Sequence, residues 1–297
     1  MMIPRRRVKT ALLLASGLLV IAAIPGFAVD VVHLNLGTLA GPGWSARAVS
    51  VQLNWLDERH ARLLLQTQRV ALPEGLGELS EVTLSCAHAQ LTATEIKCAQ
   101  GAIKAQSTVL GVQNIQTSFR YQLDTGRIDT ELQGVHIHDG TLAITASLSD
   151  ARWQIRVRGK ALSLSAVTGQ LADAGFAIPV VAGSGHLNLI ASMSGVATQL
   201  HEADVEMQLL AEEFSDAAGS VAGENLDISV RATVQAAAAG MQVALDMTGR
   251  QGALYVDPVY IEMPPQPLRL SARFDWLPTE QLVLQSLTYR HPGSVHL

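Results

Sequence analysis

The stretch WQIRVRG, residues 153–159, alternates strictly between apolar side chains and charged or amide side chains. Its apolar members are Trp153, Ile155 and Val157, with Gln154 and two arginines between them. Successive side chains of a β-strand point to opposite faces, so a period of two is typical of a strand with one apolar and one polar face. This stretch therefore predicts a half-buried strand.

The same period continues along nearly all of the chain after Asp30. Asp or Gly residues separate the alternating runs, as in Asp124-Thr125-Gly126 and Asp139-Gly140, and they favour tight turns. Short turns between strands indicate antiparallel hairpins. The expected strands cover residues 49–55, 63–73, 82–86, 94–98, 119–123, 128–137, 142–148, 153–159, 187–193, 203–210, 226–234, 241–248, 268–276 and 282–289. We therefore expect an all-β fold built as an antiparallel meander.

One segment departs from the strand pattern. Leu164, Val167, Leu171 and Ala174 recur at helical spacing, and Gly175 stands where a C-terminal helix cap belongs. One short amphipathic helix is therefore expected. The prolines at 258, 264, 265 and 267 indicate sheet edges or crossings, because proline cannot donate a hydrogen bond to a central ladder.

The composition excludes several classes of protein. Of 297 residues, 48% are hydrophobic and 16% charged, so the chain has ample apolar surface to bury and is not disordered. The net charge is −5, with 21 Lys plus Arg against 26 Asp plus Glu, which gives no overall basic footprint for nucleic acid. Aromatic residues are only 4%, which disfavours a platform for stacking bases. We expect no nucleic-acid partner.

The amino end has the features of a membrane-targeting segment. Arg5, Arg6, Arg7 and Lys9 precede an uncharged apolar run at 11–24. We expect residues 1–29 to form an N-terminal membrane helix that keeps its cations in the cytoplasm and places the chain after Asp30 on the other side. Cleavage after Gly26-Phe27-Ala28 remains an alternative. The expected anchor residues are Leu12, Leu13, Leu14, Leu18, Leu19, Val20 and Ile21.

Two cysteines, Cys86 and Cys98, lie in the exported part. Each belongs to an expected strand, and the two strands follow one another along the chain. An oxidising compartment favours a disulfide between adjacent strands, whereas the spacing excludes a C-x-x-C redox site. We expect a structural disulfide.

The sequence contains no complete catalytic or metal-binding motif. Gly183-Ser184-Gly185 opens like a dinucleotide-binding loop, but Asn188 replaces its last glycine and a strand follows. His201-Glu202 begins like a zinc-protease helix, yet Val205 stands where the second histidine is required. His136 and His138 share one strand end without a visible third ligand. We expect no enzyme, no metal and no cofactor.

The paired carboxylates have a simpler interpretation. Glu212 and Glu213 lie beside a turn, and Asp204 and Glu206 lie on the polar face of a strand. Solvation accounts for both pairs, so neither indicates acid–base chemistry.

An apolar face on every strand needs a cover. A second sheet would supply it in a closed sandwich, and lipid would supply it in an open, curved sheet. The period of two does not decide between these alternatives.

Several segments resemble AsmA-like envelope proteins. LSLSAV at 162–167, GSGHLNL at 183–189 and Ser194-Gly195 follow the family layout of short helix, glycine-flanked strand start and strand ending in Ser-Gly. FSDAAGSVAGENL at 214–226 and GALYVDPVY at 252–260 are similar to the YdbH-type branch, sometimes labelled a dicarboxylate-transport domain. The likeness covers the chain loosely from Asp30 and better from residue 162 onward.

The resemblance implies an elongated, curved antiparallel β-sheet that forms an open groove. It also implies an inner-membrane, single-pass protein with its bulk in the periplasm, which binds phospholipid acyl chains and contributes to lipid transport between the inner and outer membranes. The family has no catalytic residues to carry over. The strand-face aliphatics expected to line the groove are Leu187, Leu189, Ile228, Val230, Val243, Leu245, Leu268 and Leu270. On the other face, replacement of Asn188 or Gln242 is expected to be nearly silent.

The expected domains are the anchor at 1–29, a β-meander with the disulfide at 30–160, and a helix plus groove segment at 161–297. The chain is shorter than YdbH-like proteins, which implies either an N-terminal fragment or a short relative whose groove an outer-membrane or periplasmic partner completes.

An alternative function is an anchored periplasmic interaction module similar to the N component of type II secretion, which Trp44 and Trp55 loosely fit. An exported hydrolase is a third possibility.

Overall fold

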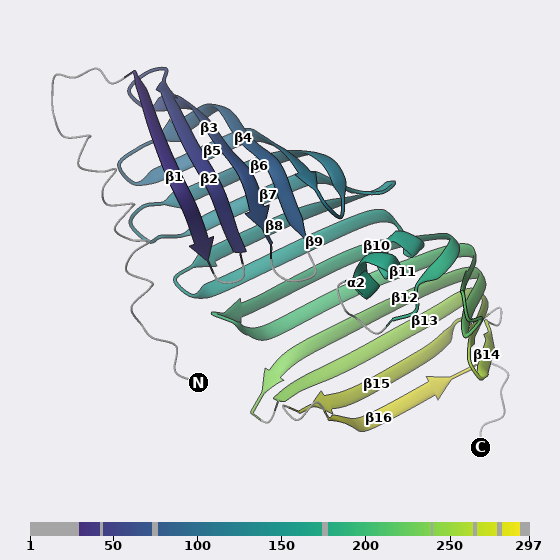
Figure 1. Ribbon diagram of the computed structural model, residues 1–297. Helices are drawn as coiled ribbons and strands as arrows, with labels where there is room; N and C mark the ends of the chain where they lie inside the picture. Colours follow the sequence, from purple (N-terminus) through teal and green to yellow (C-terminus); the bar gives the residue numbers. More distant parts are fainter. Residues whose placement is uncertain are drawn as a thin grey trace.

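The computed structural model describes residues 30–41, 44–72, 77–173, 178–238, 240–263, 266–277 and 281–291. Sixteen strands form one sheet, and each strand of the main path pairs antiparallel with the strand before it (Figure 1). The strands are β1 (Val31–Gly41), β2 (Trp44–Trp55), β3 (His60–Ala71), β4 (Glu78–Leu91), β5 (Glu95–Ser107), β6 (Gly111–Gln122), β7 (Ile128–Ile137), β8 (Gly140–Ser149), β9 (Arg152–Ser163), β10 (Val181–Val196), β11 (Gln199–Asp216), β12 (Val221–Ala237), β13 (Gly240–Val256), β14 (Val259–Glu262), β15 (Leu268–Trp276) and β16 (Leu282–Arg290). The expected all-β antiparallel meander is confirmed.

Within the described residues, the sheet is open along both edges. β1 and β16 are its edge strands, and β14 is a short branch that pairs only with β13. β9 runs through residue 160, where the meander was expected to meet the second segment, and the ladder continues on both of its sides. The described chain is therefore one continuous sheet from β1 to β16.

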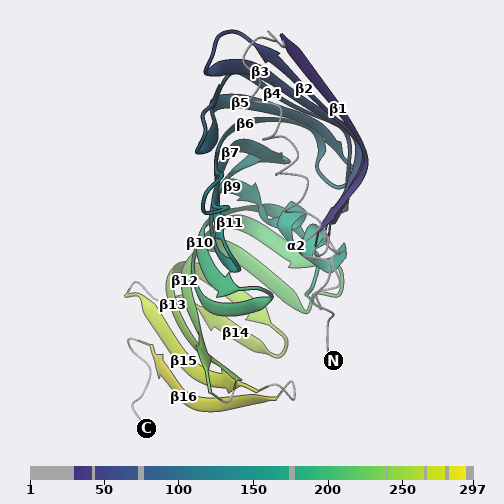
Figure 2. The same ribbon diagram turned by 90° about the vertical axis from the view of Figure 1, so that its left-hand side faces the viewer.

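Bulges contribute to the bending of the sheet. Glu81, Gly134, Ala161 and Asn225 all have positive φ, and each lies where the register between neighbouring strands shifts. A bulge adds a residue to one strand, which bends that strand and increases its twist. Figure 2 shows the sheet as an open trough whose strands curve across the view.

The short helix expected from the sequence is α2 (Leu164–Asp173), which directly follows β9. Ser163 begins it as an N-cap, since its Oγ accepts a hydrogen bond from the Ala166 amide at 3.4 Å. The expected cap at Gly175 lies outside the described residues.

Few large side chains are fully enclosed. Among the described residues, the largest fully buried side chains are those of Leu268, Cys86 and Cys98. Some of the buried residues form two clusters, one around the cysteines and one around Phe214 at the α2 end of β10–β13, and other buried residues lie outside both. No second sheet covers the first in the described part of the chain, so the open alternative is the one adopted.

Candidate functional site: the apolar face of the sheet

The apolar side chains of the sheet form rows that run across it from edge to edge. Residues paired directly across antiparallel strands point to the same face, so the strand pairings trace each row. One row takes a residue from every strand except β14, and only Gly101 and Thr117 interrupt its apolar character. From β1 to β16 it reads Val32, Leu53, Leu63, Cys86, Gly101, Thr117, Leu132, Ile144, Val157, Ala191, Val205, Ala232, Leu245, Ala272 and Leu287.

This row is long. Neighbouring strands lie about 4.8 Å apart, so it extends for roughly 65–70 Å along the sheet. A parallel row beside it runs from Trp55 through Ala61, Phe119 and Ile155 to Leu284 and is also largely apolar. The apolar face is therefore a continuous surface and not a set of separate patches.

The opposite face is polar at the same positions. Its row one residue away from the apolar row contains Arg158, Glu206, Arg231 and Asp246 on β9, β11, β12 and β13. Ile190 on β10 is an exception, at 49% exposed. The sheet is therefore amphipathic, as the period of two predicts.

All of the groove candidates named from the sequence lie on the apolar face. Successive pairings connect Leu187 to Ile228 and Leu268 in one row, and Leu189 to Val230 and Leu270 in the next. Val243 and Leu245 occupy the two rows after those. The structure thus brings the predicted residues together on one surface.

Two of these candidates are covered by the chain itself. Ile228 is 5% exposed and Leu268 is 0% exposed, whereas the other candidates are only partly buried. Met263 covers this row, because a Cβ added at Gly249, between Ile228 and Leu268, would collide with the Met263 sulfur. Ile228 and Leu268 therefore belong to a local core and are not available to line a groove.

That local core closes one side of the apolar face. It contains Phe214, Leu226 and Met263, with Leu164 of α2 and Ile261 of β14 packed against it. β14 is the fold-back that places Met263 over the sheet. The prolines around it suggested a crossing, but no period in the sequence indicated which residues it would cover.

Among the described residues, neither core cluster extends over the middle of the central strands. Leu132, Ile144 and Val157 of β7, β8 and β9 are partly buried and belong to neither core cluster. Met207 and Met247 extend the candidate surface between Leu189, Val230 and Leu270, and the sequence reasoning missed them. Their position in the alternation of β11 and β13 was the signal that could have identified them.

The expected disulfide is present and lies on the apolar face. Cys86 of β4 and Cys98 of β5 are bonded, with their Cα atoms 6.1 Å apart. The ladder between the strands is interrupted there, since the pairing passes from Cys86–Gly101 to Ala89–Cys98. Leu63, Leu91 and Phe119 pack against the cysteines. The bond thus ties two strands at a break in their backbone hydrogen bonding.

The sequence reasoning also missed Gln113, whose polar side chain is 2% exposed. Its Nε2 donates to the carbonyl oxygens of Leu110 and His136 at 2.9 and 3.0 Å, and its Oε1 accepts from the His136 amide at 2.9 Å. Ladder pairing between β6 and β7 runs only from Gln116–Gln133 to Tyr121–Ile128. Gln113 therefore takes the place of a backbone partner where the two strands part.

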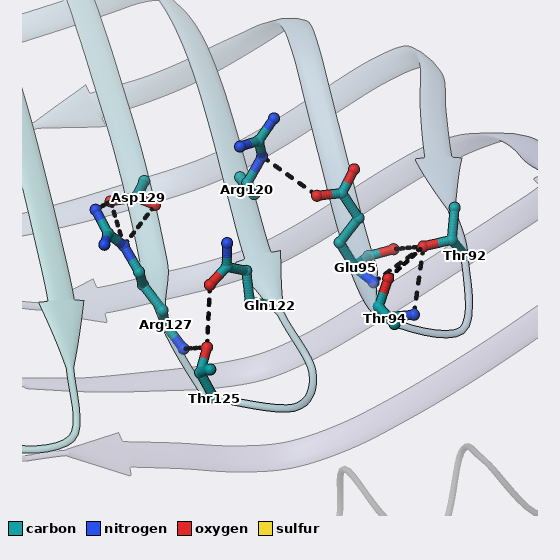
Figure 3. Close-up of polar contacts among 8 residues, drawn as sticks. All are labelled: Thr92, Thr94, Glu95, Arg120, Gln122, Thr125, Arg127 and Asp129. Atoms are coloured by element: carbon teal, nitrogen blue, oxygen red, sulfur yellow. Dashed lines mark hydrogen bonds and ion pairs between the residues drawn. The ribbon is translucent and has the colours of Figure 1, made fainter.

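On the polar face, several carboxylates are paired with arginines. Arg127 donates to both oxygens of Asp129 at 2.9 to 3.1 Å, and Arg120 lies 3.3 Å from Glu95 (Figure 3). The hydrogen bond from Arg127 to Asp129 raises the pKa of the arginine above its ordinary value. These exposed pairs organise the surface without enclosing a reaction site.

The carboxylates considered as acid–base candidates are placed differently from one another. Asp204 and Glu206 both contact Arg231, at 2.9 and 3.3 Å, and the hydrogen bond to Asp204 raises the pKa of that arginine. Glu212 and Glu213 are exposed near the end of β11. The first pair is thus ion-paired as well as solvated.

The position of Asn188 argues against the expectation that its replacement is nearly silent. Its Oδ1 accepts a hydrogen bond from the Ala161 amide at 3.0 Å, where Leu162 and Gly159 pair with the residues on either side of Asn188. The side chain thus pairs an amide that the bulge leaves outside the ladder. Because of this hydrogen bond we expect its replacement to destabilise the fold, whereas Gln242 is exposed.

Two further expectations from the sequence are the absence of a metal site and the presence of an N-terminal membrane helix. No group of three or more potential metal ligands occurs within the ranges that the structure describes. In those ranges no helix has both the length and the apolarity to span a bilayer. The expected anchor, from Leu12 to Ile21, lies outside the described residues.

Comparison with known proteins returned no match to a family model, a curated protein or a solved structure.

Proposed function

We propose that this protein binds phospholipid acyl chains along the apolar face of its sheet. In this proposal residues 1–29 anchor it in the inner membrane, and the periplasmic sheet contributes to lipid transport between the inner and outer membranes. The observation that carries the proposal is the unbroken row of paired residues from Val32 to Leu287, which no second sheet covers within the described chain.

The size of this face supports a lipid cover. With a length of roughly 65–70 Å and a breadth of several alternating residues, the outline of the face measures on the order of 1,000 Å². Part of this outline, around Cys86 and Leu268, is already buried. A typical soluble monomer tolerates a largest apolar patch of about 300–600 Å². An occupant that removes the excess from water stabilises the protein by about 25 cal/mol for each Å².

The chemistry of the face favours acyl chains over a polar ligand. Its rows consist mainly of Leu, Ile, Val, Ala and Met with few hydrogen-bonding groups. The buried polar side chains bond to the chain's own backbone; they are Thr67, Ser107, Gln113 and Thr117. Such a wall provides no fixed donors to select a head group. The row of paired residues from Val32 to Leu287 is about four times as long as the hydrocarbon layer of one bilayer leaflet, which is roughly 15 Å deep.

Site-specific photo-crosslinking tests the proposal. A photoreactive residue at Leu189, Leu245 or Leu270 of the full chain is expected to capture phospholipid in the cell, and mass spectrometry of the adduct identifies it. The same residue at Asp246 faces the polar side and should capture none. The membrane anchor keeps lipid near the protein whichever position carries the crosslinker. Lipid adducts therefore support the proposal only if they form at the apolar positions and not at Asp246.

Leu268 provides a second control. It lies on the apolar face but is 0% exposed beneath Met263, so a crosslinker there is expected to react with the chain itself. If Leu245 also crosslinks only within the chain or to another protein, lipid binding is wrong. The anchored interaction module then becomes the better interpretation.

A further inference from the structure

The polar face of β9 carries a line of cations. Arg152, Arg156, Arg158 and Lys160 occupy alternate positions together with Gln154, and all of these side chains are exposed. We call the four cations the β9 stripe. Alternate residues of a strand lie about 6.7 Å apart, so the stripe extends for roughly 27 Å.

The strands on either side place no carboxylate opposite the stripe. Arg156, for example, lies between Thr145 and Ser192, and Arg158 lies between Ala143 and Ile190. The remaining partners are Thr141 for Lys160 and Ser149 and Val196 for Arg152. Within the described residues, no ion pair joins any member of the stripe to a carboxylate.

Some other arginines of this face do have carboxylate partners, although Arg269 and Arg273 of β15, like the stripe, form no ion pair within the described residues. Arg120, Arg127 and Arg231 each have a carboxylate within 3.3 Å (Figure 3 for the first two). The chain also carries a net charge of −5, so concentrated positive charge is a local exception. Four like charges on one strand repel one another, and an anionic ligand would relieve that repulsion.

We propose that the β9 stripe binds an extended acidic segment of a partner protein. Carboxylates on alternate residues of an extended segment repeat at about 6.7 Å, which matches the spacing of the cations. Arginine offers a planar pair of donors that fits a carboxylate bidentately, and the hydroxyls of Thr145 and Ser192 beside Arg156 can donate further hydrogen bonds.

The width of the stripe selects a linear ligand over a membrane surface. Glu131 and Asp204 lie two strands away from Arg156 on either side, at about 10 Å. A planar anionic membrane would meet these carboxylates as well as the cations. A single extended chain lying along β9 meets only the cations, and the neighbours of the stripe include no aromatic residue on which nucleic-acid bases could stack.

This binding is independent of the proposed lipid site, because it uses the opposite face of the sheet. The test uses the full chain in a non-ionic detergent and a fluorescent nine-residue peptide in which glutamate alternates with threonine. Fluorescence anisotropy is expected to show saturable binding that weakens about tenfold between 50 and 300 mM salt, because salt screens exposed charges. A peptide with glutamine in place of glutamate should not bind.

Paired variants locate the site. Arg156→Gln/Arg158→Gln is expected to weaken peptide binding by on the order of a hundredfold, since each charge-assisted hydrogen bond lost weakens binding about tenfold. Arg269→Gln/Arg273→Gln removes the same charge from the polar face of β15 and should leave the affinity within about twofold. Arg156→Lys/Arg158→Lys keeps the charge and should bind at an intermediate level.

Three outcomes would overturn the proposal. They are no binding of the acidic peptide at 50 mM salt, equal losses in the β9 and β15 variants, or stripe-dependent binding to phosphatidylglycerol vesicles without peptide binding. The last outcome would assign the stripe to a membrane. Lipid crosslinking at Leu245 in the same variants reports separately on the apolar face.

Discussion

At the scale of single residues, hydrogen-bonding side chains repair breaks in the ladder. Gln113 presents both an acceptor and a donor to His136, as a residue of a neighbouring strand would. A buried amide or carbonyl without a partner costs about 1–3 kcal/mol. The side chain of Gln113 therefore joins β6 and β7 where their backbones are not hydrogen-bonded to each other. We call this place the seam between β6 and β7.

Gln113→Leu should lower the free energy of unfolding by about 2–4 kcal/mol, because it leaves the amide and carbonyl of His136 without their partner. Urea unfolding followed by circular dichroism measures the change. Gln116→Leu is the matched control, since Gln116 is exposed and its strand pairs with β7 through the backbone, and it should change stability by less than about 0.5 kcal/mol. Equal effects would show that Gln113 does not hold the seam.

The turn between β11 and β12 contains a second such contact. Ser220 Oγ donates to Asp216 Oδ2 at 2.5 Å, and the Val221 amide donates to Oδ1 at 2.9 Å. Hydrogen bonds to the charged carboxylate, that from Ser220 above all, hold the pKa of Asp216 below its ordinary value of 3.8. A lowered folded pKa stabilises the turn above pH 3.8, and this contribution is lost as the pH falls through the folded pKa.

Ser220→Ala should therefore raise the pKa of Asp216 toward 3.8. NMR titration of the ¹³C-labelled carboxyl group measures the pKa directly. If the pKa does not move, the Val221 amide alone accounts for the shift.

At the scale of elements, bulges bend the strands and leave backbone groups to be paired by side chains. At the bulge between β9 and β10, Ala161 has a φ of 51°, and its amide bonds to Asn188. The bulge lies directly before Ser163 and α2. It therefore positions the point where the chain leaves the sheet and helps to cover the apolar face.

Asn188→Ala should lower the free energy of unfolding by about 1–2 kcal/mol through the loss of this hydrogen bond. Gln242→Ala removes an exposed amide from the same face and is expected to change stability by less than about 0.5 kcal/mol. Thermal unfolding of both variants provides the comparison. Equal stability would mean that water replaces Asn188 at the bulge.

At the scale of the whole molecule, each strand of the main path pairs with its neighbours on that path, and β13 also pairs with β14. Stability in such an array is close to a sum of neighbouring interfaces, as in repeat proteins. A change on the uncovered central strands should therefore alter what the face binds more than whether the sheet forms.

Val157→Asp places a charge in the middle of the long row, where neither core cluster reaches. A carboxylate against acyl chains costs about 2.5–3.5 kcal/mol by membrane-insertion scales. We expect phospholipid crosslinking at Leu245 and Leu189 to fall at least severalfold, with the far-UV circular dichroism spectrum unchanged. Thr145→Asp on the polar face of β8 is the control, and an equal loss from it would contradict the two-faced arrangement.

The sequence by itself determined fourteen of the sixteen strands, the short helix, the disulfide and the face on which their side chains lie, but it missed β1 (Val31–Gly41) and β14 (Val259–Glu262). These follow from local rules: the period of two assigns faces, and Asp and Gly mark the turns. Leu189, Val230 and Leu245 could therefore be assigned to one face before any pairing was known.

The tertiary structure alone decided what covers that face. No second sheet packs on the described one, β14 places Met263 over Ile228 and Leu268, and Gln113 closes the seam at β7. The same pairings leave the cations of β9 without a carboxylate opposite them. Alternation along a strand is local, whereas curvature accumulates over many bulges and a fold-back joins residues far apart in the chain, so no short window of sequence contains either.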